Sequence, residues 1–283
     1  MKSKDELISK KDENRIFSEI ESWLKKVPSI YVLKEWESSL NKAKRDLFWS
    51  FYEINHKWPS VLQKTFKDDG SDVNYELGSF IFKNILARTE RIDFDEEILK
   101  LDDDKITKED IRKVLEAERF IKNNSLPDMP FTGDLYKLHK YELSENATSD
   151  KEIYYLNIRP ECDIIRDKEP ELYCLECAIL DENRINSGQD NQVLFQNGNL
   201  IERVNVVYIP FIDGKIIHVK LKEIKIFSWK QKLFTKRDNK VREFGKTRIG
   251  RILPPYITKI QQKHAFYLQR QGLPVIPDKA IGD

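Results

Sequence analysis

The spacing of apolar residues changes near residue 125, and this change constrains the fold more than any other feature of the sequence. Before that point, apolar residues recur at steps of three and four, the period of an amphipathic helix. After Pro127 the period falls to two, which is typical of strands with one buried face. A helical half followed by a strand-rich half predicts an α+β protein with two domains, residues 1–125 and 126–283.

The first half is expected to form a helical bundle. The predicted helices cover residues 15–27, 30–54, 61–66 and 71–89. Pro28 should end the first of them, and Ser71 is a candidate N-cap for the fourth. Another helix, opening at Thr107, should lead into the second domain.

Four tryptophans of the first half, at positions 23, 36, 49 and 58, follow the same helical spacing. Aromatic residues at helical spacing usually face the interior of a bundle. We therefore expect all four to contribute to the core and not to a binding surface.

The second half is predicted to form an antiparallel barrel or sandwich, because its predicted strands are short and no long helices separate them. Asp213 and Gly214 predict a two-residue hairpin between two of the strands, since Gly tolerates the positive φ of a tight turn. A C-terminal helix should close the domain over residues 254–271. The predicted strands cover residues 133–141, 153–165, 172–180, 204–212, 215–221 and 223–229.

Overall charge and hydropathy narrow the class of partner. Lys and Arg total 49 against 48 Asp and Glu, so any nucleic-acid-binding surface must be local. The sequence contains no apolar run of about 20 residues and no signal-peptide core, so we expect a cytoplasmic protein without a membrane partner. The three cysteines are expected to be reduced thiols. No signature predicts a cofactor, and we expect none.

One local concentration of charge stands out. Residues 230–251, KQKLFTKRDNKVREFGKTRIGR, hold nine basic side chains against two acidic ones, with Phe234 and Phe244 interleaved. Basic residues can follow phosphates while aromatic faces stack on bases. A solvated loop and an acidic protein partner are alternative interpretations. The candidate nucleic-acid-binding residues are Lys236, Arg237, Lys240, Arg242, Lys246 and Arg248.

Cys162 and Asp163 interrupt an apolar run, and this pair has four interpretations. Catalysis would need a base near the thiol, and no Cys/His signature is present. A zinc site could combine Cys162, Cys174, Cys177 and His218, but Cys174 and Cys177 are three residues apart on a strand and should face opposite ways. We therefore expect no metal. The structural interpretation makes Cys162 a small buried residue and pairs Asp163 with Arg159 or Arg166.

The fourth interpretation is a ligand site. A polar pair at the end of a strand is also where a ligand could bind, and Arg159, Cys162, Asp163 and Arg166 are its candidate residues.

The segments PFTGDLYKL, IYYLNIRP and ELYCLECAIL, followed by the 204–229 hairpin and a closing helix, resemble the SH3-like barrel of the PemK/MazF toxin endoribonucleases. The resemblance spans about residues 130–271, and Gly133-Asp134 is its clearest match. IRPECDII is also similar to a Cys-Asp-Ile/Leu motif of bacterial barrel proteins whose closing helix ends near an Arg, here Arg270. PSIYVLKEWESSL resembles helical regions that follow receiver domains in bacterial anti-phage signalling proteins.

The chain departs from the toxin pattern where catalysis would occur. The resemblance implies an Arg before the second strand and a Thr after the third, whereas the corresponding positions offer only Lys151 and Ile179-Leu180-Asp181. A barrel without a donor for the developing charge should cleave RNA poorly. We therefore expect a defence or signalling effector whose barrel binds RNA or DNA and is catalytically degenerate. The alternatives are a regulatory adaptor whose helical domain docks a protein partner, and an active endoribonuclease of the PemK/MazF type.

Overall fold

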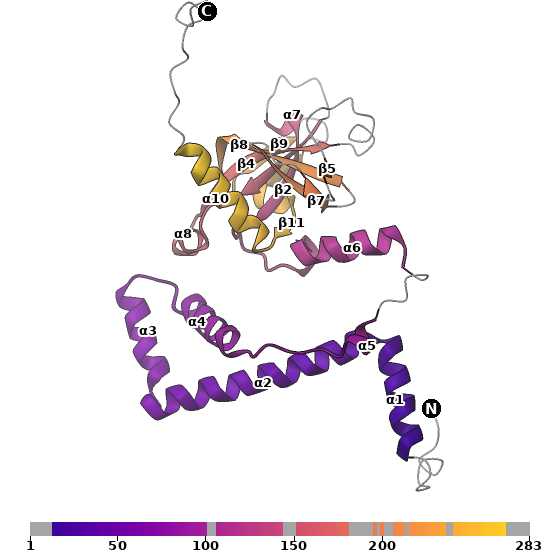
Figure 1. Ribbon diagram of the computed structural model, residues 1–283. Coiled ribbons are helices and arrows are strands. Elements are labelled where there is room, and N and C mark those ends of the chain that lie inside the picture. The colour runs from indigo at the N-terminus through magenta and orange to yellow at the C-terminus, as the bar shows by residue number, and fades with distance from the viewer. Residues whose placement is uncertain are drawn as a thin grey trace, which may run out of the picture. The chain divides into compact units, whose positions relative to one another are not determined.

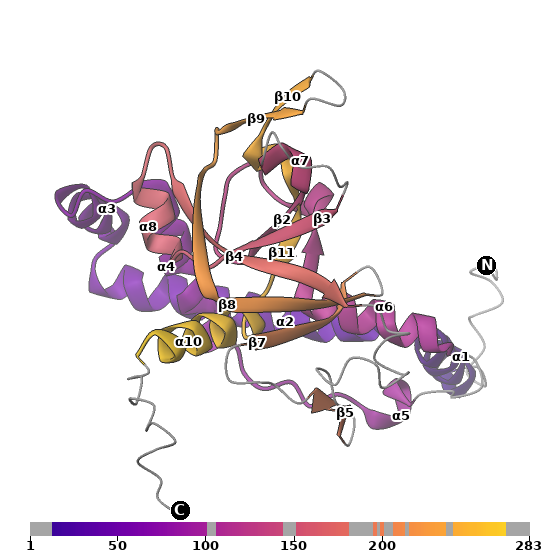
Figure 2. The same cartoon turned by 90° about the horizontal axis from the view of Figure 1, so that it is seen from above.

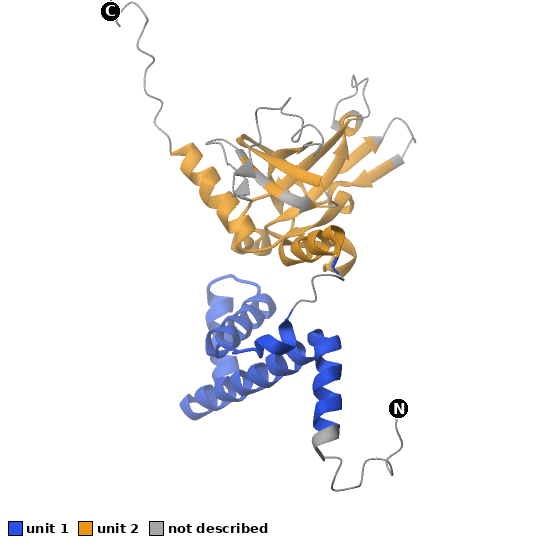
Figure 3. Ribbon diagram, turned by 45° about the vertical axis from the view of Figure 1, so that its right-hand side comes forward, with its two compact units in different colours: residues 1–106 blue, residues 107–283 orange. Residues whose placement is uncertain are grey.

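The computed structural model divides the chain into two compact units, residues 1–106 and 107–283 (Figure 3). It describes residues 13–100, 106–143, 151–180, 195–196, 199–200, 206–212, 215–235 and 240–269. Both helices and strands are present, as the sequence predicts (Figure 1). None of the helices in these ranges is long and apolar enough to cross a bilayer.

The boundary lies near residue 106 and not at residue 125 because the helix before the first strand belongs to the sheet unit. This helix, α6 (Lys108–Arg119), begins with a reciprocal capping box between Thr107 and Asp110. It runs directly into β1 (Phe120–Lys122), which pairs with β11 (Arg248–Ile252). Phe120 lies in the sheet core, so α6 and β1 fold with the second unit.

The first unit is helical throughout its regular elements. Pro28 ends the first helix and occupies the first turn of the second, where a missing N–H costs nothing. Asp72, and not Ser71, caps the fourth helix by accepting the amide hydrogen of Tyr75. The helices are α1 (Glu13–Lys26), α2 (Pro28–Ile54), α3 (Trp58–Asp68), α4 (Val73–Arg88) and α5 (Glu96–Leu99).

The expectation that the tryptophans form a core is wrong for three of the four. Trp23, Trp36 and Trp49 are 48%, 50% and 55% exposed. Trp58 does pack inside the unit, 5.2 Å from Phe51 between ring centroids. Trp36 and Trp49 lie on α2, which is 27 residues long, and its contacts with α1, α3 and α4 leave both side chains half exposed. Trp23 lies on α1 and is likewise half exposed. Helical spacing predicts a shared face but does not supply the element that covers it.

The second unit is built on one seven-stranded antiparallel sheet (Figure 2). Its strand order is β1-β11-β2-β3-β4-β8-β7. Among the described strands, β1 and β7 form the edges, and α6 contacts both of them. The central strands are β2 (Asp134–His139), β3 (Glu152–Asn157), β4 (Glu171–Leu180) and β8 (Lys215–Ser228), and β7 spans Val206–Ile212.

Shorter elements complete this unit. The strands β9 (Lys232–Thr235) and β10 (Lys240–Glu243) form a separate two-stranded ribbon, as do β5 (Phe195–Gln196) and β6 (Asn199–Leu200). The helices are α7 (Lys140–Leu143), α8 (Glu161–Arg166) and α10 (Tyr256–Leu268), and the 3-10 turns are η3 (Asn123–Ser125) and η4 (Phe244–Thr247).

The hairpin prediction is confirmed, because β7 and β8 pair antiparallel with Ile212 opposite Lys215. The turn residues 213–214 themselves lie outside the described ranges. Three other predictions need correction. The strand expected over 153–165 ends at Asn157 and is followed by α8; the strands expected over 215–221 and 223–229 are one strand; and much of segment 230–251 is regular structure.

The long strand β8 is continuous although its pairing with β4 is irregular. β4 pairs with β8 from Glu171 to Leu180, and the register shifts between Leu175 and Cys177. A bulge of this kind increases local twist and bends a strand without ending it. The polar residues Lys222 and Glu223, which suggested a break in the sequence, are exposed on this bent strand.

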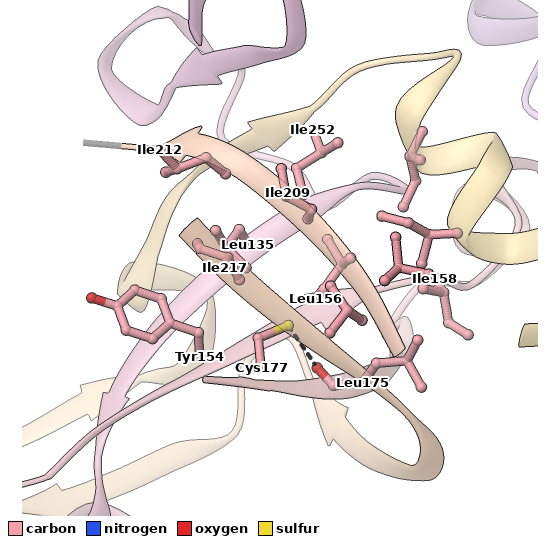
Figure 4. Packing of buried hydrophobic residues seen from close by; sticks show 14 of the residues in the cluster. Leu135, Tyr154, Leu156, Ile158, Leu175, Cys177, Ile209, Ile212, Ile217 and Ile252 are labelled. Carbon is pink, nitrogen blue, oxygen red and sulfur yellow. Dashed lines mark hydrogen bonds between the residues drawn. The ribbon is translucent and has the colours of Figure 1, made fainter. Parts of the chain in front are cut away.

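Two hydrophobic clusters pack on opposite faces of the sheet. The first lies between the sheet and α10 and includes Leu135, Leu156, Cys177, Ile217 and Ile252 (Figure 4). The second lies on the face covered by the β9–β10 ribbon and η4. Its members are Tyr136, Leu138, Tyr155, Leu172, Cys174, Phe227, Leu233 and Phe244.

Candidate functional site

The acid of the Gly133-Asp134 pair is fully buried and binds two arginines of β11. Arg248 Nη1 donates to Asp134 Oδ2 at 3.1 Å, and Arg251 Nε donates to Asp134 Oδ1 at 2.6 Å. Arg248 also donates to the Met129 carbonyl at 2.7 Å and to Asn123 Oδ1 at 2.6 Å. This network fixes the segment before β2 onto the sheet, so its first role is structural.

The backbone conformation explains why glycine occupies position 133, directly before Asp134. Its φ is +89°, and a Cβ at this position would lie 2.3 Å from the carbonyl oxygen of Ile252. Only glycine accepts both conditions without strain. The Gly-Asp pair of the sequence is therefore explained by close strand packing and a buried ion network.

Arg159 joins the loop around α8 to the start of β4. Its Nη1 donates to the Glu171 carbonyl at 2.7 Å, its Nη2 forms an ion pair with Asp167, and its guanidinium lies 5.2 Å from the Tyr173 ring centroid. The side chain is 11% exposed. Because these contacts engage both terminal nitrogens of the guanidinium, Arg159 holds the loop around α8.

Cys162 and Asp163 lie in the first turn of α8 and not on a strand. Both are exposed, and the Cys162 Sγ lies 3.4 Å from Asp163 Oδ1. The expectation of a buried Cys162 is therefore wrong, because the chain leaves the sheet at Asn157 and Pro160 starts a helix instead. Arg166, in the last turn of α8, is also exposed.

The other two cysteines point to opposite faces of the sheet, as their spacing predicts. Cys174 belongs to the cluster under the β9–β10 ribbon, and Cys177 belongs to the cluster under α10. Burial raises the pKa of both thiols well above its usual range. Within the described ranges no three His, Cys, Asp or Glu side chains gather as a metal site would require.

A polar hollow that sequence reasoning missed lies between α8, β11 and α10. Its cavity volume is about 440 Å³, and its polar lining includes Thr132, Glu161, Arg251, Thr258 and Gln261. Partial desolvation raises the pKa of Glu161, although the positive charge of Arg251 opposes the shift. The only sequence signals were weak ones: Glu161 precedes the Cys-Asp pair, and Arg251 ends the basic segment.

The basic segment forms the β9–β10 ribbon, which projects from the end of β8 (Figure 2). Leu233 faces the sheet and is 4% exposed, whereas Phe234 and its cross-strand partner Val241 are 49% and 58% exposed. Lys230 and Lys232 beside them are exposed. The ribbon therefore presents an apolar pair flanked by positive charge on its outer side.

Three of the six predicted nucleic-acid contacts are engaged by carboxylates elsewhere in the fold. Arg242 binds Glu142 through two hydrogen bonds of 2.6 Å, and Lys246 binds Asp128 at 2.6 Å. Arg248 is buried on Asp134 and cannot reach a phosphate outside the protein in this conformation. Lys236 and Arg237 lie outside the described ranges, and of Lys240 only the backbone is described.

These features define the class: an α+β chain whose second unit combines an antiparallel sheet, a packed C-terminal helix and a projecting basic ribbon. No family model matches the chain, and neither does any curated protein or solved structure.

Proposed function

We propose that the second unit is an SH3-like barrel module that binds RNA or DNA through the β9–β10 ribbon, within a catalytically degenerate bacterial defence or signalling effector. One observation carries the proposal: Phe234 and Val241 form an exposed cross-strand pair on a ribbon with exposed lysines beside it. An aromatic face on a basic strand suits a stacked base whose phosphates meet the lysines.

The barrel interpretation has support from the bending of the sheet. The register shift between Leu175 and Cys177 curves β4 and β8, and bulges of this kind allow a sheet to close on itself. The helix α6 contacts β7 and runs into β1, so one helix bridges the two edge strands.

The set of basic residues that would contact phosphates differs from the set predicted by charge alone. Lys232 is exposed on the ribbon, and Lys230 is exposed just before it. Lys236 and Arg237 follow β9 in the sequence, and Lys240 begins β10. Arg242, Lys246 and Arg248 instead stabilise the fold through Glu142, Asp128 and Asp134. The ribbon proposal therefore uses five basic residues.

Fluorescence-anisotropy titration with labelled single-stranded RNA and duplex DNA, each at two salt concentrations, tests the proposal. Phe234→Ala should weaken RNA binding by about 5- to 150-fold, the equivalent of about 1–3 kcal/mol for one stacked base. Phe266→Ala is the matched control, since Phe266 is 72% exposed on α10 of the same unit. Equal losses in both variants, or no binding at low salt, would rule the ribbon out.

The contribution of charge to RNA affinity can be measured separately from that of base stacking. Replacing Lys232, Lys236 and Arg237 with Ala should reduce the salt dependence by about one logarithmic unit for each phosphate that the variant no longer neutralises. Lys222→Ala, on the exposed part of β8, should leave the salt dependence unchanged. Resolving the same mixtures on a denaturing gel reports cleavage, and we expect intact RNA.

A second candidate function, a regulatory adaptor, is favoured by an exposed aromatic cluster on α2. Phe48, Trp49 and Tyr52 contact one another at ring-centroid distances of 5.2 to 5.7 Å, and each is about half exposed. Such a surface is typical of a protein-docking site. A photocrosslinker at position 49 should then capture a discrete partner at high salt, whereas one at position 222 should not.

A further inference from the structure

A second hollow of the sheet unit concentrates lysine side chains. It has a cavity volume of about 640 Å³ and lies beside β3, β4, β8 and the start of α7. Four lysines and two glutamates line it, which leaves an excess of positive charge. The charged lining residues are Lys140, Lys151, Lys220, Lys225, Glu152 and Glu176.

Two of these lysines are held in place by one carboxylate. Lys220 Nζ lies 2.6 Å from Glu176 Oε1, and Lys225 Nζ lies 3.5 Å from Glu176 Oε2. Lys225 also donates to the Tyr155 hydroxyl at 2.9 Å. Desolvation alone would raise the pKa of Glu176, but the two ammonium groups outweigh it and lower that pKa. The ammonium groups are thus positioned before any ligand arrives.

Of the other two lysines, Lys140 begins α7 directly after β2, and Lys151 directly precedes β3. The amide of Lys140 donates to the carbonyl of Lys151 at 2.9 Å, which brings the two residues together. Neither ammonium has an acidic partner among the described residues. Glu152, the remaining acid, is already paired with Lys137 and accepts a hydrogen bond of 2.9 Å from the Tyr154 hydroxyl. Lys140 and Lys151 therefore add two positive charges that no acid of the described residues compensates.

We propose that this lysine-lined hollow binds a phosphate monoester. A monoester carries close to two negative charges at neutral pH and offers three acceptor oxygens, which matches several converging ammonium donors. The volume exceeds the needs of phosphate alone, and Ile153, Ala178 and Ile179 supply an apolar surface for the rest of the ligand. Two sources share this chemistry: a free phosphorylated small molecule and the phosphorylated end of a nucleic-acid strand.

Isothermal titration calorimetry of the full chain with AMP, adenosine and inorganic phosphate tests the site. AMP should bind and adenosine should not, because the lysines recognise the phosphate. The double variant Lys140→Ala/Lys151→Ala should bind AMP at least about tenfold more weakly, the loss that about 1.4 kcal/mol represents. Lys222→Ala is the control, being an exposed lysine of β8 that does not line the hollow.

The pH dependence supplies a second readout. The second ionisation of a phosphate monoester has a pKa of about 6, so AMP affinity should fall as pH decreases through that value. Equal binding of AMP and adenosine, no binding of AMP, or unchanged affinity in the double variant would each overturn the proposal. Circular dichroism of the double variant should match the parent, since both lysines are exposed.

Two further arms distinguish the sources of the monoester and separate this site from the ribbon. If the ligand is a strand end, 5′-phosphorylated RNA should bind more tightly than 5′-hydroxyl RNA, and AMP should compete with it. If the ligand is a free molecule, AMP binds and the two RNAs are equivalent. Phe234→Ala should leave AMP binding unchanged in either case, so failure of the ribbon proposal is distinguishable from failure of this one.

Discussion

Arg248 and Asp134 form an ion pair of 3.1 Å in which 3% and 0% of the two side chains remain exposed. The pair joins the strands β11 and β2, and Arg251 completes it at the second carboxylate oxygen. A buried ion pair is costly to break from one side, because the remaining charge loses its compensation.

Arg248→Met should therefore lower the free energy of unfolding by about 3–5 kcal/mol. Urea denaturation followed by the fluorescence of a background variant whose only tryptophan is Trp229 measures it, since Trp229 lies in this unit and the Arg248 guanidinium lies 5.4 Å from its ring centroid. Lys246→Met removes an ion pair of the same segment, with Asp128, that is open to solvent. This control should unfold at the parental urea concentration; a destabilisation equal to that of Arg248→Met would contradict the assignment.

Replacing Gly250 or Gly78 with alanine should change stability in opposite directions. A Cβ at Gly250 would lie 2.2 Å from the Phe120 ring and 2.4 Å from the Ile121 carbonyl oxygen, so Gly250→Ala should destabilise the sheet unit by about 1–3 kcal/mol. Gly78 lies within α4 with nothing within 4 Å of an added Cβ, so Gly78→Ala should stabilise that helix by about 0.5–1 kcal/mol. Amide hydrogen exchange of β11 and α4 reports the two effects separately.

One cysteine thiol should react quickly with a thiol reagent, and the other two should react slowly, because they differ in accessibility. Cys162 is exposed on α8, whereas Cys174 and Cys177 are buried, and burial raises the pKa of their thiols. Titration of the native protein with a chromogenic disulfide at pH 8 should release one equivalent promptly and the other two only on unfolding. Cys162→Ser should abolish the fast phase, and a persistent fast phase would show that a buried thiol is reachable.

His264 should make the sheet unit sensitive to mild acid. Its Nδ1 lies 3.0 Å from the Leu221 carbonyl oxygen, its buried Nε2 has no hydrogen-bond partner in the described part of the chain, and burial lowers its pKa below 6.5. The unfolded chain binds the proton more readily, so the free energy of unfolding should decrease as pH falls below about 6.5, until pH passes the lowered pKa of the folded state. Asparagine does not titrate in this range, so in His264→Asn this part of the pH dependence of the free energy of unfolding should disappear. Urea denaturation of both proteins at several pH values measures the difference.

The sequence by itself determined the kinds of element and much of their placement. Period-three-and-four spacing predicted α1 to α4, and period-two spacing predicted β2, β3, β4 and the β7–β8 hairpin, because these patterns reflect which side chains share a face. The spacing of Cys174 and Cys177 also predicted their opposite faces correctly. Each of these inferences depends on local geometry, which the sequence contains.

Only the tertiary structure decided which charges and aromatic residues are available to a partner. Arg242 and Arg248 look like equivalent basic residues, but their partners Glu142 and Asp134 lie 100 and 114 residues away in the chain. Lys140, Lys151, Lys220 and Lys225 form no cluster in the sequence, and strand pairing brings them to one hollow. Trp49 lies at core spacing and is half exposed because none of the described helices covers it. Whether a side chain is available to a partner depends on long-range packing, which local sequence patterns do not predict.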